Sequence, residues 1–315
     1  MATPPLVIFD DCHFLRVSTR RRGSFSSELK TSGASKESVV ADLTRVKGIG
    51  GKLANELYSK GVRGIEDLVT STVVPERIRL CAKYVDDLER PISIDLADRF
   101  MEWFKLTTLM EGFDDPYLDL LIDEYLVGAH RRGIESSHDV DILVMYSENL
   151  PRELVVPGKE IKLSETIVKS IERCLRKTKQ FREAISVGES SLSLLLFLGG
   201  YVRSIDIYLS TVREAGAALI RRTGPAEFLI AIQQYAKSKG LLLNQYGLFD
   251  RSLDIVLARA SELAIFSKLG LNYVSPESRD DKALHEEIYK KAGRTGRTDG
   301  TDGTDGTDGT DGTDG

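Results

Sequence analysis

The 315-residue chain has few of the features that mark secreted, zinc-stabilised or membrane-spanning proteins. Its three cysteines, Cys12, Cys81 and Cys174, lie far apart, and so sparse and odd a set argues against a disulfide framework or a zinc site. No apolar run reaches the roughly 18 residues of a membrane span, and the first residues lack the basic region of a signal peptide. We therefore expect a reducing compartment and no membrane partner.

Overall charge excludes little. The formal net charge is −5, but residues 298–315 are six Thr-Asp-Gly triplets, so the rest of the chain is close to neutral. Local basic patches can therefore still bind nucleic acid. The triplet repeat has no apolar residue to bury, and the Ser/Gly-rich beginning contains the basic run Arg20–Arg22. Both ends are predicted to be disordered, as a leader over 1–36 and a tail over 289–315.

Apolar spacing between these ends changes along the chain. It is helical from 37 to about 127, including a helix over Ser93–Leu106 with Ser93 as its N-cap. After about Tyr125, nearly alternating segments predict strands over Asp139–Met145, Ser191–Leu198 and Tyr201–Leu209. Further helices are predicted over Ser164–Phe181, Pro225–Lys239 and Ser261–Leu269. We predict an α+β fold with a helical subdomain at 37–124, a mixed-sheet domain at 125–215 and a C-terminal α/β subdomain at 216–288.

A glycine-containing turn stands near the start of the helical part. The segment 46–52 reads Val-Lys-Gly-Ile-Gly-Gly-Lys and is followed by apolar residues at helical spacing. Gly48 and Gly50 allow a tight turn whose N–H groups can approach a phosphate, and Lys47 and Lys52 add positive charge. This pattern is typical of a helix-hairpin-helix motif, which grips a nucleic-acid backbone without reading bases. The alternative is an ordinary pair of packed helices.

Three carboxylates carry the chemical signal. Asp139 and Asp141 are two residues apart on a predicted strand, so both face the same side. Such a pair repels by about 4 kcal/mol at ~4 Å and an effective dielectric near 20, which favours a bound cation such as Mg²⁺. Asp206, on a second predicted strand, is a candidate third ligand. The glycine-bounded turn at 128–133, with Arg132, could hold a triphosphate. Together these residues indicate two-metal phosphoryl transfer, against the alternative of a solvated strand end.

These segments resemble the family X DNA polymerases. The run 128–133, Gly-Ala-His-Arg-Arg-Gly, followed by Asp139-Val140-Asp141, is similar to that family's nucleotidyltransferase signature. The hairpin at Thr44–Leu68 resembles its second helix-hairpin-helix, and the segments from Thr223-Gly224 to Arg279 resemble its C-terminal subdomain. The resemblance extends from about 37 to 288. It implies a DNA-directed DNA polymerase of the gap-filling repair type, which transfers dNMP to a primer 3′-hydroxyl and releases pyrophosphate.

The resemblance also implies the site. Two Mg²⁺ ions, with Mn²⁺ as an alternative, would be held by Asp139, Asp141 and Asp206, and Asp206 would lie nearest the primer 3′-hydroxyl. A Na⁺ or K⁺ ion would be held by main-chain carbonyls of Thr44, Val46 and Ile49. The expected nucleotide-binding residues are Gly128, Ala129, Arg132, His138, Arg221, Thr223 and Gly224. The expected DNA-binding residues are Lys47, Gly48, Gly50 and Lys52. A cis peptide is expected at Gly224–Pro225.

The expected partners are gapped or primer-template DNA and a dNTP, with a monomeric protein in the nucleus. Only 43 residues precede Thr44, and no second glycine hairpin occurs among them, so lyase activity is not expected. Some positions depart from the family pattern. Ala129 replaces a serine, His138 a glycine and Ser204 an arginine, while Arg221-Arg222 replaces the aromatic pair that lines the sugar. These departures leave two alternatives open, a template-independent or ribonucleotide-tolerant nucleotidyltransferase and a non-catalytic DNA-binding remnant.

Overall fold

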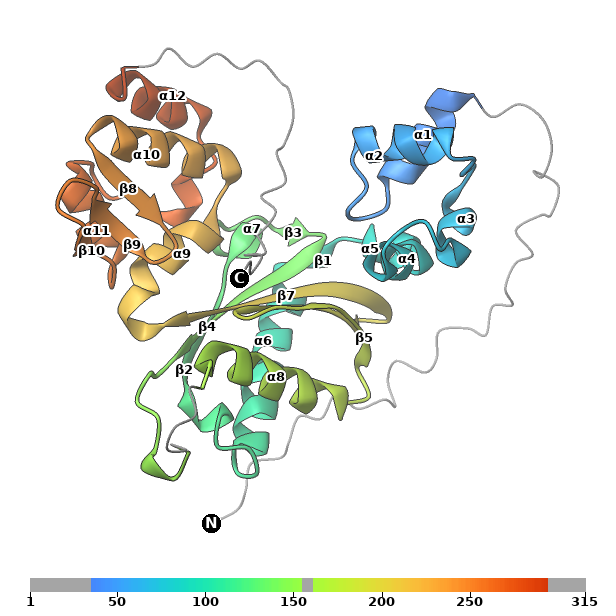
Figure 1. Ribbon diagram of the computed structural model, residues 1–315, viewed down its shortest axis with the longest axis horizontal. Coiled ribbons are helices and arrows are strands. Elements are labelled where there is room, and N and C mark those ends of the chain that lie inside the picture. The colour runs from blue at the N-terminus through green and yellow to red at the C-terminus, as the bar shows by residue number, and fades with distance from the viewer. Residues whose placement is uncertain (1–34, 155–160, 294–315) are drawn as a thin grey trace, which may run out of the picture.

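The computed structural model describes residues 35–154 and 161–293 of the chain (Figure 1). Most of the leader and tail predicted at 1–36 and 289–315 lies outside these described residues. The inner ends of both predictions were wrong. Helix α1 already begins at Lys36, because the Ser35 side chain accepts a hydrogen bond from the Ser38 N–H. Helix α12 continues to Lys291, where burial of Ile288 anchors its last turn.

The N-terminal part is helical. Its helices are α1 (Lys36–Thr44), α2 (Gly51–Ser59), α3 (Ile65–Thr70), α4 (Glu76–Lys83), α5 (Val85–Leu88) and α6 (Ile94–Gly112). As predicted, Ser93 caps α6 by accepting a hydrogen bond from the Leu96 N–H. Helices α1 to α5 share one apolar core, which also takes in Leu195 and Val202 from the central sheet. Helices α1 and α2 and the glycine-containing turn between them thereby belong to a core that reaches the sheet.

The central part is a five-stranded sheet in the order β2-β4-β7-β6-β5. Its strands are β2 (Leu121–Leu126), β4 (Asp139–Tyr146), β5 (Phe181–Val187), β6 (Ser191–Leu198) and β7 (Tyr201–Thr211). A small separate pair is formed by β1 (Ile92–Ser93) and β3 (Ser136–Ser137). The remaining helical segments here are η1 (Leu118–Leu120), α7 (Gly128–Arg131), η2 (Arg152–Leu154), α8 (Leu163–Arg176) and η3 (Val212–Glu214). Strands β4 and β7 are parallel, and the other neighbours in this sheet are antiparallel.

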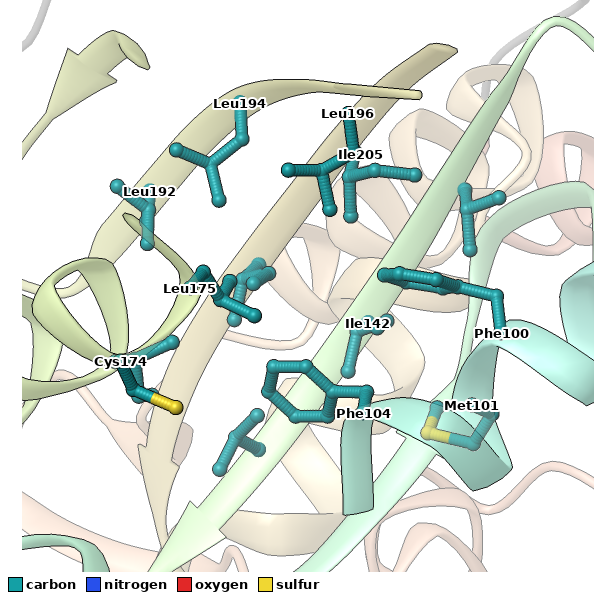
Figure 2. Close-up of a cluster of buried hydrophobic side chains, with 14 of the residues drawn as sticks. Phe100, Met101, Phe104, Ile142, Cys174, Leu175, Leu192, Leu194, Leu196 and Ile205 are labelled. Carbon is teal, nitrogen blue, oxygen red and sulfur yellow. The ribbon is translucent and has the colours of Figure 1, made fainter. Parts of the chain in front are cut away.

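One face of this sheet carries the main apolar core. Helices α6 and α8 cover it, and Figure 2 shows Phe100 and Phe104 of α6 and Leu175 of α8 packed toward Ile142 and Ile205. Because side chains alternate along a strand, the neighbours of these sheet residues point to the opposite face. Asp141 and Asp206 are such neighbours. The acidic side chains are therefore on the face that α6 and α8 leave open.

The C-terminal part forms a further subdomain. It contains α9 (Ala215–Thr223), α10 (Ala226–Ser238), β8 (Leu241–Asn244), β9 (Gly247–Asp250), β10 (Ile255–Ala258), α11 (Glu262–Leu269), η4 (Pro276–Ser278) and α12 (Lys282–Lys291). Its antiparallel sheet has the order β10-β9-β8, and its own core is built around Phe228 and Phe266. Figure 1 shows this subdomain and the α1–α5 helices at opposite sides of the central sheet. The peptide at Gly224–Pro225 is cis, as expected.

Two local predictions were wrong. The helical pattern was expected to continue to about residue 127, but Leu121–Leu126 is strand β2, because it pairs with β4 at the sheet edge. The helix predicted over Ser164–Phe181 ends at Arg176, and Phe181 begins strand β5, which pairs with β6. In both cases strand pairing overrides the local pattern.

Among the described residues, no helix combines the length and apolar character needed to cross a bilayer.

Candidate active site

The parallel pairing of β4 and β7 brings the predicted acidic residues together. Its register sets Asp141 opposite Asp206 and Asp139 opposite Ser204. All three carboxylates are on the face away from the main core. The Asp206 side chain is 12% exposed and the Asp139 side chain is 38% exposed, so the cluster runs from the interior to the surface. The predicted strands and their alternation are therefore correct at this site.

Asp141 is the most perturbed of the three carboxyl groups. Burial, followed by the nearby charges of Asp139 and Asp206, raises its pKa to about 7. Gly128 at the start of α7 lies directly against it. The φ angle of Gly128 is +61°, and a Cβ at this position would come within 2.2 Å of an Asp141 carboxylate oxygen. Only glycine fits there, which is a packing reason for the first glycine of the 128–133 turn.

The cation at this cluster is Lys47, from the turn between α1 and α2. Its Nζ is 3.2 Å from Asp139 Oδ2, 3.0 Å from Asp206 Oδ2 and 2.9 Å from the Ser204 hydroxyl. Desolvation opposes the charged ammonium, but the charges of Asp206 and Asp139 outweigh it and raise the pKa of Lys47 above its ordinary value. Lys47 was predicted to contact DNA, and that contact stays a prediction. In the structure its ammonium lies between two acidic residues.

The predicted role of Asp139, Asp141 and Asp206 as ligands of two Mg²⁺ ions stays a prediction. Within residues 35–154 and 161–293, no group of three or more His, Cys, Asp and Glu side chains is arranged to hold a metal ion. Asp139 and Asp206 meet at the Lys47 ammonium, and Asp141 packs against Gly128. Asp141 is nevertheless close enough to both acids and to Lys47 for their charges to act on its pKa. The donor set itself, three carboxylates of excess negative charge, fits a divalent cation.

Two further side chains bear on the acidic cluster, and sequence reasoning gave neither a role there. The Ser193 hydroxyl on β6 donates a hydrogen bond to Asp206 Oδ1, so both carboxylate oxygens of Asp206 have partners. The Arg222 guanidinium is stacked on the Tyr208 ring, 3.7 Å from its centroid. Burial lowers the pKa of Arg222 despite the opposing charges of Tyr208, Asp141 and Asp206. Ser193 could have been suspected, because it sits at an alternate position of a strand next to β7.

Arg132, one of the residues predicted to bind the triphosphate, already has two hydrogen-bond partners. Its Nε is 2.9 Å from Asp280 Oδ2 and its NH1 is 2.6 Å from the Thr223 carbonyl oxygen. Both partners belong to the C-terminal subdomain, so Arg132 links it to the central sheet. Gly128 and Thr223 are buried, Ala129 and Gly224 are half-buried, and His138 and Arg221 are exposed.

Arg131, which sequence analysis left without a role, belongs to a buried charge network. It donates to both carboxylate oxygens of Glu262 at 3.0 and 2.7 Å and to the Thr223 hydroxyl at 2.6 Å. Arg279, fully buried, donates to the same carboxylate at 2.9 Å. Adjacent arginines in the 128–133 turn thus both hold the C-terminal subdomain, through different acidic partners.

The hairpin has the conformation that its glycines suggested. Val46 and Ile49 are buried, the Ile49 N–H donates to the Val46 carbonyl at 2.9 Å, and Gly48 has a φ of +94°. The exposed positions are Thr44, Gly48, Gly50 and Lys52. The predicted role of Thr44, Val46 and Ile49 as carbonyl ligands of a Na⁺ or K⁺ ion stays a prediction.

A mixed sheet with three carboxylates on one face, between an N-terminal helical part and a C-terminal α/β subdomain, is the fold of nucleotidyltransferase-like polymerases. Comparison with known proteins agrees. The family described as DNA polymerase beta thumb matches residues 218–280. The chain is similar to Repair DNA polymerase X of African swine fever virus (isolate Warthog/Namibia/Wart80/1980), with 30% identity over 154 residues, 49% of this chain and 79% of the relative. The chain therefore belongs to family X of the DNA polymerases.

Other relatives extend the match. Human DNA-directed DNA/RNA polymerase mu is 24% identical over 260 residues, which are 75% of this chain and 51% of that protein. The chain thus spans about half the length of this longer relative. Crystal structures of Leishmania infantum polymerase beta in a ternary P/T complex and a ternary gap complex both have a TM-score of 0.66. Identity is 22% and 21%, with 78% and 80% of this chain and 99% and 93% of those chains covered. These structures establish the likeness of fold.

Proposed function

We propose that this chain is a DNA-directed DNA polymerase that fills short gaps by adding a dNMP to a primer 3′-hydroxyl and releasing pyrophosphate. The observation that carries the proposal is the β4–β7 register, which sets Asp141 opposite Asp206 with Asp139 on the same face. The relatives support the substrate class, since one is a repair DNA polymerase and one solved structure is a gap complex.

Asp139, Asp141 and Asp206 would hold two Mg²⁺ ions, or Mn²⁺, in this reaction. When bound, these ions would neutralise developing charge on the phosphates and activate the primer hydroxyl. The protein supplies position and electrostatics. The rigid parallel strands fix the carboxylate spacing, and the Ser193 hydroxyl holds one oxygen of Asp206. Burial of Asp141 disfavours its ionised form, which strengthens its preference for a cation at this point.

The hairpin is the proposed contact with the DNA backbone. Gly48, Gly50 and Lys52 are exposed, and their N–H groups and positive charge suit a phosphate. A Na⁺ or K⁺ ion held by the nearby carbonyls would add to this contact. The triphosphate of a dNTP would bind at the 128–133 turn. There the Arg132 guanidinium, which already donates to Asp280 and to the Thr223 carbonyl, would bind phosphate through its remaining N–H groups or in competition with Asp280.

Primer extension on a one-nucleotide gap, with Mg²⁺ or Mn²⁺, tests the proposal. Asp206→Ala should reduce incorporation by at least about 1,000-fold, since it removes a ligand used in the transition state. Asp95→Ala is the matched control, because Asp95 is exposed on α6 and forms an ion pair with Arg99 on the same helix. Retained activity in Asp206→Ala would contradict the assignment. Duplex binding without incorporation by the unmodified chain would instead favour a non-catalytic DNA-binding protein.

A second candidate is a template-independent or ribonucleotide-tolerant nucleotidyltransferase. The observation that favours it is the position of Arg222, whose guanidinium covers the Tyr208 ring beside the acidic cluster. Human DNA-directed DNA/RNA polymerase mu is among the relatives. Two comparisons separate the candidates: gapped duplex against single-stranded primer, and dNTP against NTP. Equal use of NTP, or extension of single strands, would favour the second.

A further inference from the structure

Lys47 links two parts of the molecule that are far apart in the sequence. It lies in the hairpin turn, and its three partners, Asp139, Ser204 and Asp206, lie on the central sheet. Of the other lysines near this turn, Lys60 pairs with Glu56, four residues earlier. Within the described residues, neither Lys60 nor Lys52 bonds to Asp139, Ser204 or Asp206. The contact is therefore specific to one side chain of the hairpin.

The contact uses the oxygen atoms that a cation would use. Lys47 Nζ approaches one oxygen of Asp139 and one of Asp206 at about the same distance, and so bridges two carboxylates. The remaining oxygen of Asp206 accepts from Ser193. Asp206 therefore has no carboxylate oxygen left without a partner. A divalent ion could bind Asp139 and Asp206 together only if the ammonium moved, because like charges at this distance repel strongly.

The same contact restrains the hairpin. Lys47 stands one residue from Gly48 and three from Gly50, the positions expected to meet a DNA phosphate. While its ammonium is held by the sheet, its charge is directed at carboxylates and not at DNA. Withdrawal of the ammonium would free one positive charge beside the phosphate-binding turn and two carboxylates at the sheet. The two events are linked through one side chain.

We propose that Lys47 is a resident cation that competes with divalent metal ions for Asp139 and Asp206, so that metal binding and release of the hairpin are coupled. The inference rests on the proposed function only in taking these acidic residues as the cation site. A purely structural ion pair is the alternative, and it predicts no gain in metal affinity when Lys47 is replaced.

Titration of the full chain with Mn²⁺, without DNA or nucleotide, tests the competition, with free Mn²⁺ measured by electron paramagnetic resonance. Lys47→Met keeps the length of the side chain and removes its charge. It should bind Mn²⁺ about 5- to 100-fold more tightly than the unmodified chain, the range typical of coupled sites. Lys60→Met makes the same charge change within the same helical part and should leave the affinity unchanged. Equal affinities of Lys47→Met and the unmodified chain would overturn the inference.

A second measurement covers the case in which Lys47→Met folds less stably. Melting temperatures are compared in EDTA and in MgCl₂, because a ligand stabilises the state that binds it more tightly. The rise on adding Mg²⁺ should be larger in Lys47→Met than in the unmodified chain or in Lys60→Met. An equal rise in all three proteins would count against competition.

Asp206→Asn, made alone and together with Lys47→Met, separates failure of this inference from failure of the proposed function. If Asp206→Asn leaves Mn²⁺ binding intact in both backgrounds, the acidic residues are not the cation site and both ideas fail. If it abolishes Mn²⁺ binding while Lys47→Met has the affinity of the unmodified chain, only the competition fails. Tighter binding by Lys47→Met that Asp206→Asn abolishes is the result that we expect.

Discussion

Two clusters of charged side chains in this molecule have opposite balances of positive and negative charge. At the border of the C-terminal subdomain, one carboxylate, Glu262, is held by two guanidiniums, Arg131 and Arg279. On the open face of the sheet, three carboxylates lie near one ammonium, that of Lys47, which bonds to Asp139 and Asp206, and the Arg222 guanidinium is nearby. The first cluster has more positive than negative charge, and the second has an excess of negative charge.

The shifts in pKa follow this difference. Burial opposes ionisation of Glu262, but hydrogen bonds from Arg131 and the charge of Arg279 outweigh it and lower its pKa. Burial of Asp141 is reinforced by the charges of Asp139 and Asp206, so its pKa rises to about 7. Both carboxylate oxygens of Glu262 have guanidinium partners, which stabilise the fold, whereas the excess negative charge of the acidic cluster can accept an external cation. The comparison predicts opposite effects of neutralising an acid in each cluster.

Neutralising Glu262 should have the largest effect on the free energy of unfolding. Glu262→Gln leaves two arginines without their shared carboxylate, one of them fully buried. Removing one partner of a buried ion pair costs about 3–5 kcal/mol of unfolding free energy. Urea unfolding followed by circular dichroism measures this loss, with the exposed Glu227→Gln on α10 as control. A change below about 1 kcal/mol, no larger than the control's, would show that the network contributes little.

Neutralising Asp141 should have the opposite effect on stability and make the folded protein more stable at neutral pH. Its pKa in the folded protein, about 7, lies above the ordinary 3.8, so its protonated form contributes stability that is present below about pH 3.8 and is lost as pH rises through 7. Relative to Asp141→Asn, the chain in EDTA should lose up to on the order of 4 kcal/mol between pH 4 and 8. Asp95→Asn, on the exposed end of α6, is the control. Parallel pH profiles of the Asp141→Asn protein and the unmodified chain would contradict the burial argument.

Removing the hydroxyl that orients Asp206 should have a smaller effect. Ser193→Ala deletes one hydrogen bond to a carboxylate, which is worth about 1.5–3 kcal/mol. Ser238→Ala is the comparison, because its hydroxyl donates to the neutral Tyr235 carbonyl and its loss should cost less. Denaturant midpoints of the two variants test the order, and a larger loss in Ser238→Ala would reverse it.

The stacked arginine should contribute least. Arg222→Met keeps much of the side-chain length but removes the cation–π contact with Tyr208, worth about 0.5–1 kcal/mol. Thermal melting should show a small decrease relative to Arg221→Met, whose exposed side chain makes no ring contact within the described residues. If Arg222→Met melts at the same temperature as Arg221→Met, the contact between Arg222 and Tyr208 does not stabilise the protein.

Local pattern predicted the strands of the site well. Alternation placed Asp139, Asp141 and Asp206 on two strands, and the core on the other face confirms their shared side. The edge strands β2 and β5 were missed, because their side chains are mostly half-buried and lack clear apolar alternation. Such strands are defined by the partner they pair with and not by their own sequence.

Contacts over long sequence separations were beyond pattern reasoning. Lys47 bonds to Asp206, which is 159 positions away in the sequence. The packing of the hairpin on the sheet involves Leu195 and Val202, and nothing in their sequence context predicts this contact. Arg131 and Glu262, 131 positions apart, form a network that no spacing rule suggests. The side chains of the hairpin and turn were recognised, but their partners were not.

The activity and the stability of Asp141→Asn, measured together, test most directly whether the acidic cluster is the catalytic cation site. We expect Asp141→Asn to melt at a higher temperature than the unmodified chain in EDTA at pH 7.5, because an unfavourable buried charge is removed. We also expect its single-nucleotide incorporation into gapped DNA with Mg²⁺ to fall by at least about 1,000-fold. A more stable variant that still extends the primer at the unmodified rate would contradict the claim that this excess of negative charge is the catalytic cation site.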